Sequence, residues 1–192
     1  MTEDVRRRLR EALKVVAVAL KESDLPFALT GGYAVWARGG PEPEHDVDFL
    51  VPEVDESRAE QLLRDRGLEV VRPPEDWLFK VFVDGAMVDV LFRANGEPVP
   101  RSRFDDVDEL EVESVRMPVM GATSLISDKL NALDERACDL AKVLPAARAV
   151  REQVDWDAVR QATEHNDFAV ATLFLLQRLG VVDGSRTVDG PP

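Results

Sequence analysis

The sequence has few of the residues from which disulfides and soft metal centres are built. Its 192 residues include one cysteine, Cys138, and two histidines, His45 and His165. A single cysteine excludes an internal disulfide framework and a cysteine-built zinc site. The two histidines lie far apart and match no metal-ligand spacing. The chain therefore has no cluster of soft metal ligands.

Long hydrophobic runs are also missing. The most apolar stretch, Phe168 to Leu176, is nine residues long and contains a threonine, whereas a helix that crosses a bilayer needs about 20 apolar residues. The N-terminal segment has arginines threaded through its apolar positions, with no separate apolar region and no small-residue cleavage site, so it does not resemble a signal peptide. We expect a cytoplasmic protein with no membrane partner.

Positive charge is scarce relative to negative charge. The chain has 24 Lys and Arg against 37 Asp and Glu, so its formal net charge is −13. Broad, charge-driven binding of nucleic acid is disfavoured, because phosphate contact requires excess Lys and Arg on the contacting face. A small basic patch remains compatible with this balance. The apolar share of 45% is ordinary for a folded protein, and the length suits one domain with a small appendage.

The front part of the chain alternates between helical and extended patterns. Apolar residues spaced by three and four predict an amphipathic helix over residues 5–20. The dipeptide Asp84-Gly85 separates two β-rich runs and is a strong hairpin signal, because both turn positions need positive φ. The other predictions are strands over 27–30, 46–51, 78–83 and 86–92, helices over 33–37 and 56–66, and a loop over 38–45. We expect an α/β (α+β) fold with a mixed β-sheet flanked by helices.

The back part of the chain is predicted to be helical. Residues 93–120 are polar, and we expect loops there with a strand near Glu111 to Met117. Helical spacing from Leu125 to Leu144 predicts one helix with Ser124 as its N-cap. Two further helices follow over 156–162 and 168–179, the last closed by Gly180. The expected division is a sheet domain over 1–120, a C-terminal helical bundle over 121–180 and a flexible tail over 181–192.

Two acidic residues lie close together in an apolar strand. Asp46 and Asp48 are two residues apart, so alternation places both carboxylates on one face of the strand. Their Cα atoms would be roughly 6.5 Å apart at about 3.3 Å per residue. Such a pair can share a divalent cation, although a solvated strand end would carry the same pattern.

A third acidic residue, Asp89, interrupts an apolar strand. A two-residue turn at Asp84-Gly85 pairs Lys80 directly with Asp89, with their Cβ atoms about 5 Å apart. One interpretation is a buried ion pair and nothing more. The other is that Asp89 faces a metal shared with Asp46 and Asp48, while Lys80 moderates its charge.

The pair Gly31-Gly32 lies between a short strand and a short helix. Glycine lets backbone N–H groups approach a phosphate closely, and the following helix N-terminus favours negative charge. A plain tight turn would show the same residues.

These features occur in one order between Ala28 and Phe92. The chain contains LTGGYAVWARGGPEPEHDVDFLV and then VDVLF: a Gly-Gly turn, an Asp-x-Asp strand, and a later strand with one more acidic residue. This arrangement resembles the nucleotidyltransferase superfamily, which includes DNA polymerase β and small bacterial nucleotidyltransferases. The helical part, with Lys129, Leu130, Leu133, Arg136 and Asp139, is more loosely similar to abortive-infection and toxin–antitoxin nucleotidyltransferases.

The resemblance implies a mechanism. An acceptor hydroxyl would attack the α-phosphorus of an NTP, such as ATP, and pyrophosphate would leave. Two Mg²⁺ ions would bridge the nucleotide and the carboxylates, with Asp46 and Asp48 binding both ions. By the same resemblance, Asp89 would bind the ion nearest the acceptor and help to deprotonate it. Gly31 and Gly32 would cradle the β and γ phosphates.

Four further residues have a candidate role beside an ordinary structural one. Lys129 is either a phosphate contact or a solvated helix lysine. His45 either contacts the phosphate or the acceptor, or is a plain loop histidine. Lys80 is assigned to the nucleotide side of the site, next to Asp89. Trp77 is a packing residue on which a base could stack.

Two functions stay open. The first is an enzyme that transfers NMP to a tRNA end, a protein side chain or a small molecule, in the toxin case with an antitoxin partner. The negative charge favours a protein or a cationic small molecule over RNA. The alternative is a catalytically silent module that binds a nucleotide or a partner protein. Glu44, where toxin-type relatives carry Arg or Thr, motivates that alternative.

Overall fold

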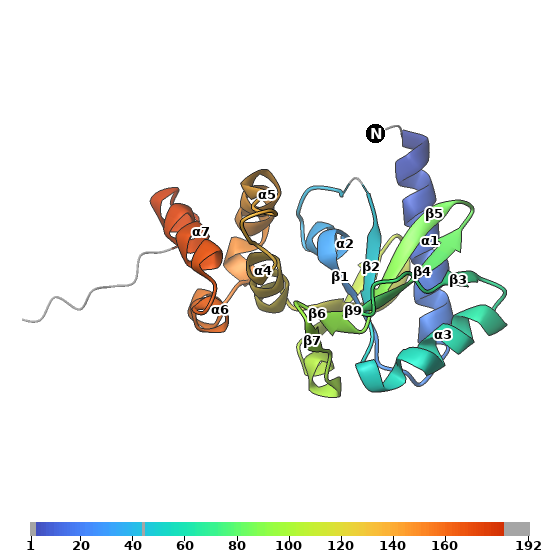
Figure 1. Cartoon of the computed structure of the whole chain (residues 1–192). Coiled ribbons are helices and arrows are strands. Elements are labelled where there is room, and N and C mark those ends of the chain that lie inside the picture. Colours follow the sequence, from blue (N-terminus) through green and yellow to red (C-terminus); the bar gives the residue numbers. More distant parts are fainter. Residues whose placement is uncertain (1–2, 44, 183–192) are drawn as a thin grey trace, which may run out of the picture.

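The computed structural model describes residues 3–43 and 45–182. A mixed seven-stranded sheet forms its centre, in the order β3-β4-β5-β2-β1-β9-β8 (Figure 1). The strands of this sheet are β1 (Ala28–Thr30), β2 (Val47–Leu50), β3 (Glu69–Val71), β4 (Leu78–Val83), β5 (Ala86–Leu91), β8 (Val107–Val112) and β9 (Val115–Met120). A separate two-stranded ribbon consists of β6 (Arg93–Ala94) and β7 (Glu97–Pro98).

Helices lie on both sides of the sheet. They are α1 (Glu3–Lys21), α2 (Gly31–Ala37), α3 (Glu56–Asp65), α4 (Ala122–Asn131), α5 (Leu140–Val150), α6 (Trp156–Thr163) and α7 (Asp167–Arg178). Short 3-10 turns cover Glu53–Asp55 (η1), Arg101–Asp105 (η2) and Arg151–Gln153 (η3). Figure 1 shows α1 and α3 on one side of the strands, and α2 with α4–α7 on the other.

The first helix and the central hairpin match their predictions. Leu9, Leu13, Val16 and Leu20 of α1 are buried, as an apolar stripe at helical spacing requires. Strands β4 and β5 pair antiparallel, with Lys80 opposite Asp89. The turn residues Asp84 and Gly85 have φ of 48° and 78°, the positive values that a primed hairpin turn needs.

The prediction for residues 93–120 was wrong. The segment Glu111 to Met117 is not one strand, because a turn at Glu113 and Ser114 divides it into the ends of β8 and β9. Both turn residues have positive φ, 48° and 65°. Glutamate and serine do not favour such values, so the sequence carried no clear signal for this turn. Strand β9 then pairs parallel with β1, so it lies inside the sheet rather than in a loop.

The single helix predicted from Ser124 to Leu144 was also wrong. Helix α4 ends at Asn131 and α5 begins at Leu140. The Asp134 carboxylate accepts hydrogen bonds from two amides in the connection, and Asn166 donates to the carbonyl groups of Asn131 and Leu133. These bonds satisfy backbone groups that a continuous helix would have used.

The start of α4 differs from its prediction too. Gly121 is the N-cap residue of α4, while the hydroxyl of Ser124 hydrogen-bonds the Asp106 carboxylate instead. The last two helices follow their predictions closely, and Gly180 has φ of 66° just beyond α7.

The C-terminal end of the described chain is packed. Val181 and Val182, which the sequence assigned to the tail, are buried against the core. Residues 183–192, the rest of the predicted tail, and Glu44 lie outside the described residues. Within the described parts, no helix combines the length and the hydrophobicity that a membrane span requires.

Candidate active site

A cavity of about 520 Å³ lies between the sheet and helix α4. Strand residues form one wall, which we call the sheet wall, and it carries Gly31, Asp46, Asp48 and Asp89. Helix α4 forms the facing helical wall, which the β6–β7 ribbon and Trp77 extend at the rim. The residues of the helical wall and rim are Leu125, Asp128, Lys129, Ala132, Arg93, Ala94, Asn95, Gly96, Asp76 and Trp77.

The three acidic residues meet on the sheet wall. Strands β2 and β5 are parallel neighbours, and their register places Asp48 directly beside Asp89. Asp46 precedes β2 by one residue, on the same face as Asp48. One carboxylate oxygen from each of the three lies within 4.8 Å of the others. Sequence alternation and strand pairing therefore converge on one acidic cluster.

The cluster is electrostatically strained without a counter-ion. Burial, followed by the negative charges of Asp46 and Asp89, raises the pKa of Asp48 to about 7. Lys129 and a hydrogen bond from the backbone amide of Gly32 oppose this rise. Carboxylates held this close are stabilised either by a proton or by a cation. All three are hard oxygen ligands, the type that Mg²⁺ prefers, so the residues fit a divalent metal.

Asp89 has a cation partner as well. The Lys80 ammonium lies 2.9 Å and 3.2 Å from its two carboxylate oxygens. Burial still raises the pKa of Asp89, while the hydrogen bond from Lys80 opposes that rise. Lys80 does not line the cavity. Both interpretations of the pair thus describe the geometry, since Asp89 is paired with Lys80 and also belongs to the cluster.

Gly31 and Gly32 are the first two residues of α2, which begins two residues earlier than predicted, and they support Asp48. Gly31 has φ of +62°, and a Cβ built there would lie 1.9 Å from Oδ2 of Asp48. The Asp48 carboxylate therefore occupies the space that any larger residue would need. Gly32 contributes its amide to Asp48 and packs under Pro43, whose Cβ lies 2.8 Å from the position of an added Cβ. Only Gly31 of the two lines the cavity.

Helix α4 brings a lysine to face the carboxylates. Lys129 lines the cavity, and burial lowers its pKa, an effect that the negative charge of Asp48 opposes. Next to it, Asp128 accepts a hydrogen bond of 2.5 Å from Arg103, and its backbone carbonyl accepts one from Asn95. Lys129 was predicted from the sequence, whereas Asp128 and Asn95 were missed. The Asn95-Gly96 turn dipeptide was the available signal for the ribbon.

Among the other predicted residues, His45, Arg136 and Asp139 do not line the cavity, whereas Trp77 does. His45 is exposed and does not line it. Arg136 lies in the connection after α4, and Asp139 is the N-cap residue of α5. Trp77 lines the cavity and is 42% exposed, which fits a rim position better than a core position.

Known proteins were compared with the chain by sequence and by structure. No family model matches it, and no curated protein is detectably similar. The solution structure of the antibiotic-resistance factor ANT(2'')-Ia matches with a TM-score of 0.61 and 18% identity, over 88% of this chain and 97% of that one. The crystal structure of ANT(2'')-Ia with adenylyl-2''-tobramycin gives 0.62 and 16%, over 81% and 97%.

A further solved structure gives a similar match. An antigenic nucleotidyltransferase-like protein from Paracoccidioides brasiliensis aligns with a TM-score of 0.56 and 13% identity, over 95% of this chain and 97% of that one. At these identities the likeness shows the fold. The chain has the nucleotidyltransferase fold, which confirms the expectation drawn from the Gly-Gly and Asp-x-Asp pattern.

Proposed function

We propose that this protein is a metal-dependent nucleotidyltransferase, which moves an NMP from an NTP to an acceptor hydroxyl and releases pyrophosphate. The observation that carries the proposal is the meeting of Asp46, Asp48 and Asp89 on one wall of a 520 Å³ cavity. A buried acidic cluster at the mouth of a central sheet is costly unless a cation compensates it. We infer that this cation serves nucleotide transfer, because the chain shares its fold with nucleotidyltransferases.

Each residue of the cavity has a distinct task in the proposal. Asp46 and Asp48 would hold Mg²⁺, and Asp89 would complete the ligand set and accept the proton of the acceptor hydroxyl. Bound Mg²⁺, two ions in our proposal, would offset negative charge on the attacking and leaving oxygens. Lys129, across the cavity, would contact the triphosphate. The backbone at Gly31 would face the β and γ phosphates.

The remaining predicted residues take smaller parts. Lys80 would act through Asp89, which it already binds, rather than through the nucleotide. His45 is exposed and has no assigned role. Trp77, at the rim, offers an aromatic face to whichever ring-containing substrate enters the cavity.

For the acceptor, we favour a cationic small molecule over a tRNA end. Five carboxylate residues line the cavity, against the two cations Lys129 and Arg93; they are Asp46, Asp48, Asp76, Asp89 and Asp128. With a net charge of −13, the protein would repel a polyanion and attract an amine-bearing acceptor. A solved structure of similar fold contains adenylyl-2''-tobramycin.

A transfer assay tests the function. The protein would be incubated with each α-labelled NTP and Mg²⁺, together with a panel of aminated sugars, total RNA or total protein. We expect Mg²⁺-dependent label transfer that EDTA abolishes, with the amine-bearing small molecules as the best acceptors. Label on RNA alone would support a toxin-type enzyme instead. Mg²⁺-dependent NTP binding with no transfer would support the silent nucleotide-binding module.

Lys129 offers a second test of the same proposal. Lys129→Met removes the charge but keeps the length of the side chain. We expect KM for the NTP to rise about tenfold, because one charge-assisted phosphate contact is lost. Lys14→Met is a suitable control, since Lys14 lies on α1, pairs with Glu11 and does not line the cavity. Equal KM values in the two variants would show that Lys129 is an ordinary helix lysine.

A further inference from the structure

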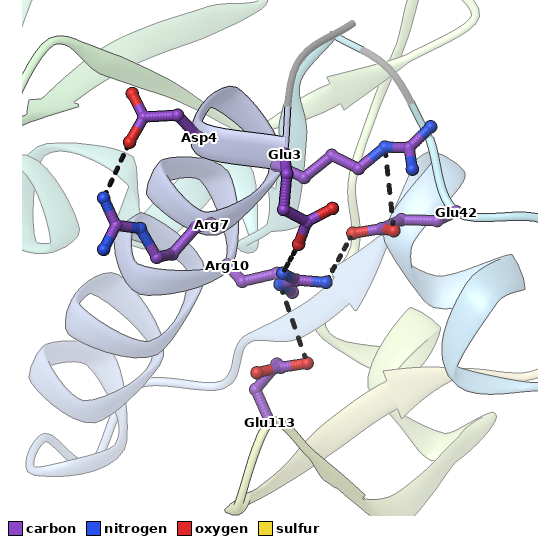
Figure 2. Close-up of polar contacts among 7 residues, drawn as sticks. Glu3, Asp4, Arg7, Arg10, Glu42 and Glu113 are labelled. Atoms are coloured by element: carbon purple, nitrogen blue, oxygen red, sulfur yellow. Dashed lines mark hydrogen bonds and ion pairs between the residues drawn. The ribbon is translucent and has the colours of Figure 1, made fainter.

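A cluster of ion pairs joins helix α1 to the segment before β2. Figure 2 shows Arg10 of α1 directed at Glu42, with Glu3 and Glu113 on its other sides. Nη1 of Arg10 lies 3.2 Å from Oε1 of Glu42, and Nε of Arg6 lies 3.9 Å from Oε2 of the same residue. The Arg10 and Glu42 side chains are only 22% and 18% exposed, so solvent screens this pair less than a surface pair.

The ion-pair cluster borders helix α2 as well. Tyr33, which follows Gly32, is fully buried, and its hydroxyl has no hydrogen-bond partner within the described residues. Burial and the nearby charge of Glu42 raise the pKa of Tyr33 to about 12, and Arg10 opposes that rise. The cluster and the start of α2 therefore share one electrostatic environment.

Glu42 is linked to the acidic cluster by direct contacts. The next residue, Pro43, packs on Gly32 so closely that Gly32 has no room for a Cβ. The amide of Gly32 in turn donates a hydrogen bond to Asp48. The path from α1 to the acidic cluster therefore runs from Arg10 through Glu42, Pro43 and Gly32 to Asp48.

We propose that Glu42 is a positioning residue for the transfer reaction, and this proposal rests on the function proposed above. Held by Arg10 and Arg6, Glu42 keeps Pro43 on Gly32 at the start of α2, and Gly32 keeps its amide on Asp48. Glu42 does not line the cavity, so it acts through Gly32 and not on the substrate. Small displacements of reacting groups are costly, because transfer requires aligned atoms.

The test compares two glutamates on the same arginine. Glu42→Ala removes the carboxylate that holds Pro43. Glu3→Ala is the matched control, since Glu3 binds Arg10 at 2.8 Å but lies on α1 itself. The first measurement is amide hydrogen exchange of Gly32, which needs no activity. We expect exchange to be at least about tenfold faster in Glu42→Ala and unchanged in Glu3→Ala.

The second measurement is steady-state transfer. In Glu42→Ala we expect kcat to fall by roughly tenfold to a hundredfold, with KM for the acceptor within about twofold of wild type. Glu42→Gln, which still accepts a hydrogen bond from Arg10, should recover most of kcat. Should Glu42→Ala fail to fold, Arg10→Gln would be measured in the same way.

The two measurements separate the two proposals. Gly32 exchange that is equally slow in Glu42→Ala and Glu3→Ala would overturn the positioning role, whatever the activity. A kcat in Glu42→Ala equal to that of wild type would overturn it as well. Faster Gly32 exchange in Glu42→Ala, together with a wild-type protein that transfers no nucleotide, would support the coupling and reject the proposed function.

Discussion

The two walls of the cavity are held in place by different forces. The sheet wall carries Asp48 on β2 and Asp89 on β5, whose positions are set by a ladder of backbone hydrogen bonds, and Asp46 directly before β2. The helical wall has no such ladder, and α4 is held by apolar packing of Leu125, Ile126 and Leu130 in the core. Side-chain hydrogen bonds add to this packing: Arg103 binds Asp128 of α4, and Asn166 binds the carbonyl groups at its end. Displacing the sheet wall requires a break in register, whereas a packed helix can shift slightly without breaking any backbone pairing between strands.

This difference matters for the chemistry that each wall would perform. Metal ligands need fixed spacing, and strand pairing provides it for Asp48 and Asp89. A lysine that contacts a phosphate tolerates more movement, because an ammonium on a flexible stem can adjust. The more rigid wall thus carries the groups with the stricter geometric demand.

The largest expected effect comes from removing the charge of Asp48 on the sheet wall. We expect Asp48→Asn to lower kcat for transfer by about a thousandfold or more, because metal binding stabilises the transition state by several kcal/mol. The shape of the side chain is kept, so the melting temperature should not fall. Transfer that survives the substitution would mean that the site has been misassigned.

The second test adds a methyl group next to Asp48 on the sheet wall. Gly31→Ala places a methyl group on Oδ2 of Asp48 and also strains the backbone at φ +62°. Gly67→Ala is the matched control, because its φ is +78° but nothing lies within 4 Å of the added Cβ. We expect about a hundredfold loss of transfer for Gly31→Ala and near-normal transfer for Gly67→Ala. Equal transfer by the two variants would mean that a Cβ at residue 31 does not disturb Asp48.

The third test uses the pKa of Asp48. Because the folded protein raises this pKa from 3.8 to about 7, the native state holds a proton that the unfolded state releases between those values. In EDTA, the unfolding free energy of wild type relative to Asp48→Asn should therefore fall by a few kcal/mol from pH 4 to pH 8. Urea titrations of both proteins at the two pH values would measure this difference. A pH-independent difference contradicts a shifted Asp48.

Addition of Mg²⁺ sharpens the same comparison. At pH 8 the cation should restore stability to wild type and leave Asp48→Asn little changed, because ligands that bind only the native state stabilise it. Equal stabilisation of both proteins would place the cation elsewhere.

The smallest expected effect lies on the helical wall. Asn166 caps α7 and also donates to two carbonyl groups at the end of α4. Asn166→Ala should lower the unfolding free energy by about 2 kcal/mol, since a cap and two further hydrogen bonds are lost. Asp155→Ala, which removes the α6 cap alone, should lose about 1 kcal/mol. Equal losses by urea unfolding would mean that the contacts with α4 contribute nothing.

The local parts of the acidic cluster could be predicted from spacing and turn chemistry, while the meeting of Asp89 with Asp46 and Asp48 was expected from the family resemblance. A spacing of two residues places Asp46 and Asp48 on the same face of the strand. The Asp84-Gly85 turn fixes the register that pairs Lys80 with Asp89. The helical wall could not be predicted in the same way. The end of α4 depends on Asn166, more than thirty residues further along the chain, and the strand at Val115–Met120 is recognised only by its partner β1.

The sequence by itself determined which side chains share a face of each strand, and hence that the carboxylates of Asp46 and Asp48 would lie on the same side. Backbone alternation and turn chemistry act over a few residues, so they are readable without the fold. Only the tertiary structure decided that β2 and β5 lie side by side, that Lys129 faces their carboxylates, and that Glu42 lies against Arg10. Those relations arise when distant segments bury their apolar faces together, and no short stretch of sequence contains both partners.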